Sequence, residues 1–439
     1  MRDFDSRFQQ PDSVKVVVYA IRSRRGLLFA VAFILWMIVY SGCYYFLFRG
    51  HPPAVFVAIK DAILMGYIFL ATSMFCIRGF RLSTAVRMFV ENWLLPLVLI
   101  ALVYFAIDIQ RAGSLIESVH SLRDLFMPFV ILGIGIALGS RSNFPVVIFL
   151  RWFALLSIPV LLLGIYEHFF FTYMDAAKFG LIDESRTFSN FVRANASGDQ
   201  ILGVRSFGVF DSSIGMGLFC SAAFFNSTCG RRLSKPPERW LHNMVLVISV
   251  TALVFTFERA TLGGALFGWL FTLRIPQAKK LFVSLVLVSG FCALMAWFTI
   301  AGGSLDLSTL GHLAAFGTTF MYLADKPWGY GISFSGTRPS QVPLDGDYLN
   351  VLLNVGPLGL FMFLRIYWKL LKIVKLSSSS SKVQACGSAV QAGAICLLVT
   401  MTVLMVYPNS GSWIFHLWLG VLAGVSITPD STLNRAYGS

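Results

Sequence analysis

Long apolar runs separated by shorter polar segments recur along the whole 439-residue chain. About 20 residues of helix cross a hydrocarbon core of about 30 Å, and most of these runs approach that length. The predicted spans, about twelve in number, lie near residues 27–48, 54–77, 88–107, 124–139, 144–166, 207–225, 240–257, 261–274, 280–300, 346–368, 386–407 and 411–427. We therefore expect an all-α, polytopic integral membrane protein whose single transmembrane domain covers 1–439.

Two polar connections between predicted spans are much longer than the others. They cover 167–206 and 301–345, and the second contains the turn-rich run Pro327-Trp328-Gly329-Tyr330-Gly331. Long loops without regular structure are usually functional or disordered. A serine-rich connection at 369–385 has the composition of a flexible linker and is expected to lie in the cytoplasm.

Composition and charge agree with a membrane location. Apolar residues make up 56% of the chain and charged residues only 13%, against about 25% charge in a typical soluble domain. The net charge of +14 is compatible with nucleic-acid binding, but the basic residues cluster in alternate connections, as the positive-inside rule predicts. We therefore expect no nucleic-acid partner, both termini in the cytoplasm, and the two long connections as periplasmic loops.

Two arginines lie where a transmembrane helix is predicted to begin. Arg259 belongs to the short break Glu258-Arg259-Ala260, and Arg205 precedes the sixth span. The free N–H groups and dipole of a helix N-terminus favour an anion, and a guanidinium adds a bidentate phosphate contact. The alternatives are that Arg259 pairs with Glu258 and that Arg205 pairs with Asp211.

Three further acidic or ionisable side chains are candidates for proton transfer. Asp345 and Asp347 stand where a helix is predicted to follow the second long connection, where they could also serve as N-caps. His312 lies earlier in that connection and is a candidate anion contact, base or interface residue.

Candidate substrate contacts complete the set. They are Arg186 and Arg193 in the first long connection, and Trp328, Tyr330 and Arg338 in the second. Basic side chains attract an anionic substrate and aromatic rings can stack on sugars, although solvated charge and interfacial anchoring are the alternatives. The seven cysteines show no C-x-x-C pairing, which favours packing residues over metal ligands, so we expect no metal site.

Four elements in order, across roughly residues 203–365, resemble the Wzy/WaaL-type O-antigen polymerase and ligase superfamily of bacterial inner membranes. They are Arg205-Ser206-Phe207-Gly208-Val209-Phe210, Thr256-Phe257-Glu258-Arg259-Ala260-Thr261-Leu262-Gly263, Pro327-Trp328-Gly329-Tyr330-Gly331, and the run from Asp347-Tyr348-Leu349 to Gly356-Pro357-Leu358-Gly359.

The resemblance implies transfer of a glycan at the periplasmic face, from an undecaprenyl-diphosphate carrier to an acceptor hydroxyl, without a cofactor. Arg259 and Arg205 would bind the diphosphate, Asp347 or Asp345 would be the base, and His312 would assist, in a position where relatives tend to have arginine. The partners implied are an undecaprenyl-diphosphate-linked oligosaccharide, membrane lipid, and the chain-length regulator and flippase of the same pathway.

The expected activity is polysaccharide polymerisation, for O-antigen, capsule or exopolysaccharide. Ligases of this family usually carry His-Asn where this chain has Asp345-Gly346, which favours a polymerase over a lipid A-core ligase. An R-x10-G motif known in some polymerases is not found at the predicted external arginines. A flippase or other transporter is the alternative of another class, although such carriers place charge near the bilayer midplane and often show repeats.

Overall fold

The computed structural model describes residues 12–48, 53, 55–56, 59, 62–63, 66, 84–110, 114–141, 144–171, 192–194, 201–210, 212–256, 258–273, 286, 307–335, 346–376, 380–402, 406 and 409–427. Its longer helices are α1 (Asp12–Gly42), α4 (Leu95–Gln110), α5 (Leu115–Gly139), α6 (Val146–Phe170), α8 (Ser213–Leu233), α9 (Arg239–Phe255), α10 (Arg259–Thr272), α12 (Leu307–Asp325), α13 (Asp347–Leu376), α14 (Ser381–Thr400) and α15 (Ser410–Ile427). Shorter elements are the π-helical turns η1 (Cys43–Leu47) and η2 (Phe89–Leu94), α3 (Thr84–Met88), the 3₁₀ turn η4 (Pro236–Glu238), and the antiparallel strands β1 (Val192–Ala194) and β2 (Ile201–Val204).

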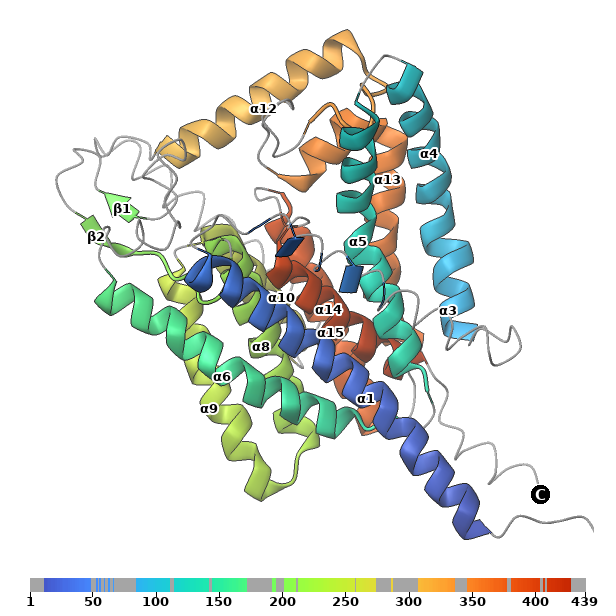
Figure 1. Ribbon diagram of the computed structural model, residues 1–439, viewed down its shortest axis with the longest axis vertical. Coiled ribbons are helices and arrows are strands. Elements are labelled where there is room, and N and C mark those ends of the chain that lie inside the picture. Colours follow the sequence, from blue (N-terminus) through green and yellow to red (C-terminus); the bar gives the residue numbers. More distant parts are fainter. Residues whose placement is uncertain are drawn as a thin grey trace, which may run out of the picture.

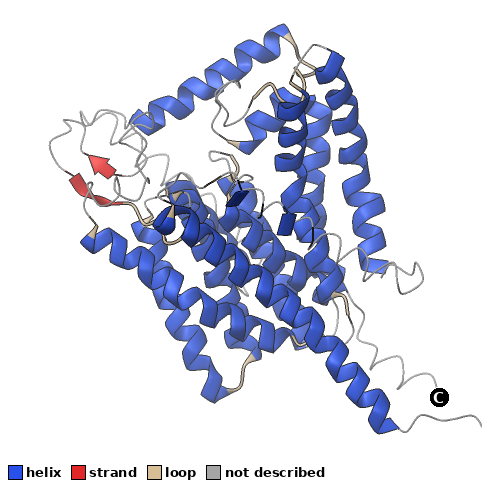
Figure 2. Cartoon of the chain, in the orientation of Figure 1, coloured by secondary structure: helices blue, strands red, loops and turns tan. Residues whose placement is uncertain are grey.

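The helices form a bundle, with the small sheet at its edge (Figures 1 and 2). Among the described residues, eight helical segments are long and apolar enough to cross a membrane, as in a multi-pass membrane protein. They include all or most of α1, α4, α5, α6, α9, α13, α14 and α15. Predicted spans 54–77 and 280–300 lie largely outside the described residues, and α8 and α10 are helical but do not meet the same criteria, so the number twelve stays a prediction.

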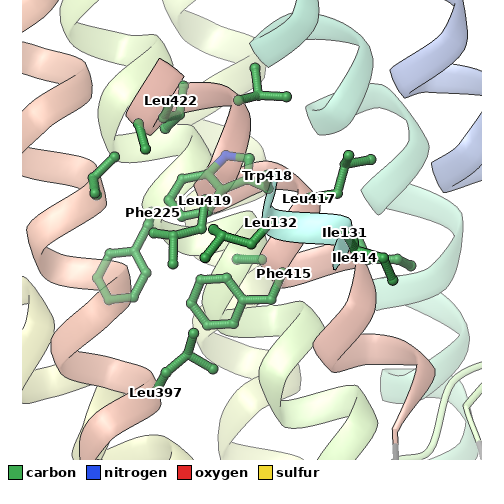
Figure 3. Close-up of a cluster of buried hydrophobic side chains, with 14 of the residues drawn as sticks. Ile131, Leu132, Phe225, Leu397, Ile414, Phe415, Leu417, Trp418, Leu419 and Leu422 are labelled. Carbon is green, nitrogen blue, oxygen red and sulfur yellow. The ribbon is translucent and has the colours of Figure 1, made fainter. Parts of the chain in front are cut away.

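Helix α15 is the centre of the bundle. Nearly all of its side chains are buried, and they interdigitate with side chains of α5, α8 and α14 (Figure 3). The close approach requires small residues, because a Cβ at Gly135 of α5 would stand 2.6 Å from the Leu417 carbonyl oxygen of α15. A Cβ at Gly264 of α10 would likewise stand 2.7 Å from the Cys396 carbonyl oxygen of α14. At these two positions glycine therefore permits close helix packing.

Contacts between chain segments define two ends of the bundle. At one, called here the basic end, the start of α6 meets η4 through Arg151 and Glu238, and the end of α8 meets the end of α10 through a hydrogen bond from Arg232 to the Thr272 carbonyl. The opposite end is called here the polar end. It brings together the last turns of α6 and α9 with the first turns of α8, α10 and α15, and it holds most of the predicted site residues that are described.

The structure corrects three predictions about the connections. The segment 301–345, expected to be a loop, contains the 19-residue helix α12, which crosses the end of the bundle at a steep angle to α4, α5 and α13 (Figure 1). Leucines and phenylalanines recur in it every three or four residues, a spacing that its polar residues obscured. Asp108 was expected to follow the predicted span 88–107, but it is buried in α4, which continues to Gln110. The sixth helix begins at Ser213 rather than near 207, because the preceding residues are bonded to α6 and α9 instead.

Candidate functional site at the polar end

An extended segment leads from β2 into α8 and is fixed to two neighbouring helices. The Ser206 N–H donates to the carbonyl of Phe255, at the end of α9, over 3.0 Å. The Ser206 hydroxyl donates to the Gly164 carbonyl of α6 over 2.6 Å. This segment, called here the Arg205 segment, comprises residues 205–210, and most of it is buried although it is not helical.

A carboxyl group holds the same segment at the two residues that follow Ser206. Glu167, in the last turn of α6, is fully buried, and its Oε2 atom accepts the N–H groups of Phe207 and Gly208 over 2.8 and 2.7 Å. Gly208 has a φ of +59°, a left-handed conformation that favours glycine. Glu167 was not among the predicted site residues.

Arg205 forms a buried ion pair with Glu258. Its Nη1 atom lies 3.1 Å from Glu258 Oε1, and the two side chains are only 14% and 9% exposed. The Ser213 hydroxyl, in the first turn of α8, donates to the same carboxylate oxygen. The partner considered for Arg205 was Asp211, which lies outside the described residues, and the partner considered for Arg259 was Glu258, which instead binds Arg205.

Arg259 is the first residue of α10, as the sequence predicted, and it is exposed. The break between α9 and α10 is short because α9 ends at Phe255 and the Glu258 N–H bonds the Thr256 hydroxyl over 3.2 Å. A cation in the first turn of a helix is opposed by the helix dipole. An anion bound at this position would be favoured by both the guanidinium and the helix N-terminus.

Asp347 also contributes to this end of the bundle. It is the first residue of α13 and is 5% exposed. Its Oδ2 atom accepts the Val406 N–H over 2.8 Å, in the connection between α14 and α15. Asn409, at the end of that connection, accepts a hydrogen bond of 2.8 Å from Ser212, which is the N-cap of α8.

Hydrogen bonds and one ion pair between chain segments connect the predicted residues Asp347 and Arg205. Asp347 bonds the α14–α15 connection, that connection bonds Ser212, and Ser213 bonds the Glu258 that pairs with Arg205. Arg259 follows Glu258 directly. The starts of α8, α10, α13 and α15 thus belong to one hydrogen-bonded region, and the partial positive charges of their N–H groups favour an anion there.

The turn-rich run forms a separate contact with a kink in α13. Gly356 has a φ of +70° and is followed by Pro357, which has no N–H to donate to the carbonyl of Leu353. The Tyr330 N–H takes that role, over 2.7 Å, and the Gly331 N–H donates to the Asn354 carbonyl over 3.2 Å. The run at 327–331 therefore donates hydrogen bonds to the carbonyls that have no donor within the kinked helix.

Trp328 and Tyr330 are held differently within this turn. Trp328 is 75% exposed, and its backbone carbonyl accepts a hydrogen bond from the Tyr104 hydroxyl. The Tyr330 ring stacks on Phe334 at 4.0 Å, and its hydroxyl lies 2.8 Å from Asp325. Partial burial and the Asp325 carboxylate raise the pKa of Tyr330 to about 12, so the phenol stays protonated at neutral pH.

The structure leaves several predicted residues unplaced. Asp345, Arg186 and Arg338 lie outside the described residues. For His312 in α12 and Arg193 in β1, only the backbone is described. Their roles stay predictions.

The residues that sequence reasoning missed are polar groups that act inside the bundle. Glu167 and Asp108 lie near the ends of apolar spans, and a carboxylate within such a span was the signal that could have identified both. Asp108 accepts hydrogen bonds from Ser118 and from Ser333, which fixes the turn after α12 to α4 and α5. The serines themselves carried no usable signal.

Within the part of the chain that the structure describes, no group of three or more His, Cys, Asp or Glu side chains could hold a metal ion. The chain matches no known family model and no curated protein sequence.

Proposed function

We propose that this protein is a membrane glycosyltransferase of the Wzy/WaaL type, a polysaccharide polymerase that uses a polyprenyl-diphosphate-linked donor. The observation that carries the proposal is Arg259, exposed in the first turn of α10 beside the buried pair of Arg205 and Glu258. A guanidinium at a helix N-terminus has the chemistry to bind a diphosphate and to stabilise the charge that develops on it as it leaves.

The two arginines have different proposed roles. Arg259 contacts the diphosphate directly, because it is exposed. Arg205 is largely buried and neutralised by Glu258. Its main proposed role is therefore structural, to maintain the shape of the site. Its Nε atom is buried without a hydrogen-bond partner among the described residues.

Asp347 is the proposed base for the acceptor hydroxyl, with Asp345 as the second candidate. The Val406 N–H bond holds the Asp347 carboxylate in a fixed orientation. Asp347 is 5% exposed, so the acceptor hydroxyl would have to approach a largely buried carboxylate. A base must come within hydrogen-bond reach of its proton, and binding of substrate commonly tightens such geometry.

The proposed orientation places the polar end in the periplasm and the basic end in the cytoplasm of a bacterial inner membrane. The basic end carries Arg141, Arg151, Arg231, Arg232 and Arg239, all near helix ends. The positive-inside rule assigns such an end to the cytoplasm. A lipid-linked glycan at the periplasmic face would then meet the polar end.

The test uses purified protein in detergent or vesicles with an undecaprenyl-diphosphate-linked oligosaccharide. A polymerase yields a ladder of longer lipid-linked products, and Arg259→Ala should remove it. Transfer of one glycan to lipid A-core without a ladder would replace polymerase by ligase. Movement of the lipid-linked glycan across the vesicle bilayer without any longer product would overturn the proposal in favour of a transporter.

A further inference from the structure

Glu167 occupies a backbone site that is suited to an anion. Two successive N–H groups, of Phe207 and Gly208, point at the same carboxylate oxygen, and Gly208 has the left-handed conformation. Successive N–H groups arranged in this way form concavities that bind anions. In this protein the chain itself supplies the acceptor, the Oε2 atom of Glu167 in the last turn of α6.

The burial of Glu167 has a free-energy cost that packing of an apolar helix does not explain. Glu167 lies within an apolar helix and is fully buried, and its second oxygen, Oε1, has no hydrogen-bond partner in the described structure. A buried acceptor left unsatisfied is destabilising. An apolar residue would fill the same place at the end of α6 without that cost, but it would leave two buried N–H groups without an acceptor.

The segment that Glu167 holds is the one that carries Arg205. The residue between the Glu167-bonded N–H groups and Arg205 is Ser206, which is itself bonded to α6 and α9. Arg205 then reaches Glu258 at 3.1 Å, at the start of α10. Movement of residues 206–208 would therefore move the guanidinium out of its ion pair.

We propose that Glu167 is a positioning residue: it holds residues 205–210 against the ends of α6 and α9, so that Arg205 meets Glu258. Its effect on glycan transfer rests on the function proposed above, whereas its effect on the position of the segment does not.

The position of the segment can be measured by a disulfide. A Cβ added at Gly42, at the end of α1, would lie 3.8 Å from the Val209 Cβ, and disulfides join Cβ atoms about 3.5–4.5 Å apart. The double variant Gly42→Cys and Val209→Cys, with Cys43→Ser to remove the neighbouring thiol, should therefore form a disulfide on mild oxidation. Protection of both thiols from a maleimide reagent on a gel reports its yield and rate.

The Glu167 variants are then compared in that background. Glu167→Gln keeps the length and one oxygen acceptor but replaces the second oxygen with an NH2 group, and the cross-linking rate should fall about threefold. Glu167→Leu removes the acceptor, and the rate should fall about tenfold or more. Glu91→Gln, at an exposed glutamate paired with Arg87, is the matched control and should not change the rate. Size-exclusion profiles identify the variants that fold.

The transfer assay adds a second measurement. In Glu167→Gln the kcat for glycan transfer should fall with little change in KM, because a displaced Arg205 affects charge development rather than carrier binding alone. Cross-linking at the parent rate in Glu167→Leu, or in Glu167→Gln if the leucine variant does not fold, would overturn the positioning role. A parent protein that cross-links as described but transfers no glycan would overturn the proposed function and leave the positioning role standing.

Discussion

The two ends of the helix bundle hold their charges in opposite ways. At the basic end, Arg151 and Glu238 lie 3.6 Å apart with side chains 55% and 40% exposed. At the polar end, Arg205 and Glu258 lie 3.1 Å apart with side chains 14% and 9% exposed. The first pair is screened by solvent, and the second is largely removed from it.

The difference indicates what each set of charges does. Exposed arginines that flank apolar helices set the orientation of a membrane protein, and single members of the set can be replaced. A buried pair depends on both partners, because removal of one leaves the other charged and unsolvated. The polar end is therefore where a single substitution should alter both folding and chemistry.

Breaking the buried pair should have the largest effect. Arg205→Ala or Glu258→Ala leaves one uncompensated buried charge and should lower the free energy of unfolding by about 3–5 kcal/mol. Circular dichroism during unfolding by SDS in mixed micelles measures the change.

The double variant Arg205→Met and Glu258→Met is the control for this prediction. Apolar side chains of similar volume often replace a buried pair without loss, so this variant should recover most of the stability. Single variants as stable as the parent protein would show that the pair is not buried in the membrane-embedded protein.

The second effect concerns chemistry rather than folding. Arg259→Ala should reduce the kcat of glycan transfer about 100-fold, the loss typical of removing one group that stabilises developing charge. Its stability should be unchanged or slightly higher, since a cation in the first helical turn opposes the dipole. Product ladders and unfolding curves of the same preparation separate the two effects.

Two further variants make the Arg259 measurement specific. Arg259→Lys keeps the charge but not the planar fork, and an intermediate rate is expected. Arg87→Ala, at an exposed ion pair with Glu91 between α3 and η2, should leave the rate unchanged. Full transfer activity in Arg259→Ala would contradict the diphosphate role.

The sequence predicted the class of fold and the place of Arg259, because both depend on local patterns. Apolar runs identify membrane helices, and Arg259 stands at a visible break between two of them. The partner of Arg205 could not be predicted, since Glu258 is 53 residues away and meets it only through tertiary packing. The segment with α12 was misread as a loop because its polar residues received more weight than its spacing.

The same limit applies to Asp347. The sequence located it at a helix start, where an N-cap was the simplest expectation. The structure instead gives its carboxylate a partner 59 residues away, the backbone of Val406. The local sequence pattern therefore placed Asp347 correctly at a helix start. It could not show that the Asp347 carboxylate bonds α13 to the connection between α14 and α15.

Asp347 gives the third prediction, a moderate loss of stability. Asp347→Ala leaves the buried Val406 N–H without its acceptor and should cost about 1–3 kcal/mol. Asp347→Asn keeps an oxygen acceptor and should cost less than about 1 kcal/mol. SDS unfolding curves measure both.

The asparagine variant also tests the proposed base. It should fold and bind the carrier lipid but fail to transfer the glycan, because a carboxamide does not accept the proton of the acceptor hydroxyl. Parent-like product ladders from folded Asp347→Asn would remove Asp347 from the chemistry and leave it the structural role shown by its bond to Val406.

The smallest effect is expected at the basic end, and it completes the comparison. Arg151→Gln should change the free energy of unfolding by less than about 0.5 kcal/mol, because an exposed pair gains little from attraction in water. A double-mutant cycle with Glu238→Gln should give a coupling energy below about 1 kcal/mol that declines as salt is added. The same cycle at Arg205 and Glu258 should give a larger coupling that salt changes little. Equal coupling at the two pairs would mean that burial does not separate the two ends, and the polar end would lose its status as the sensitive region of the protein.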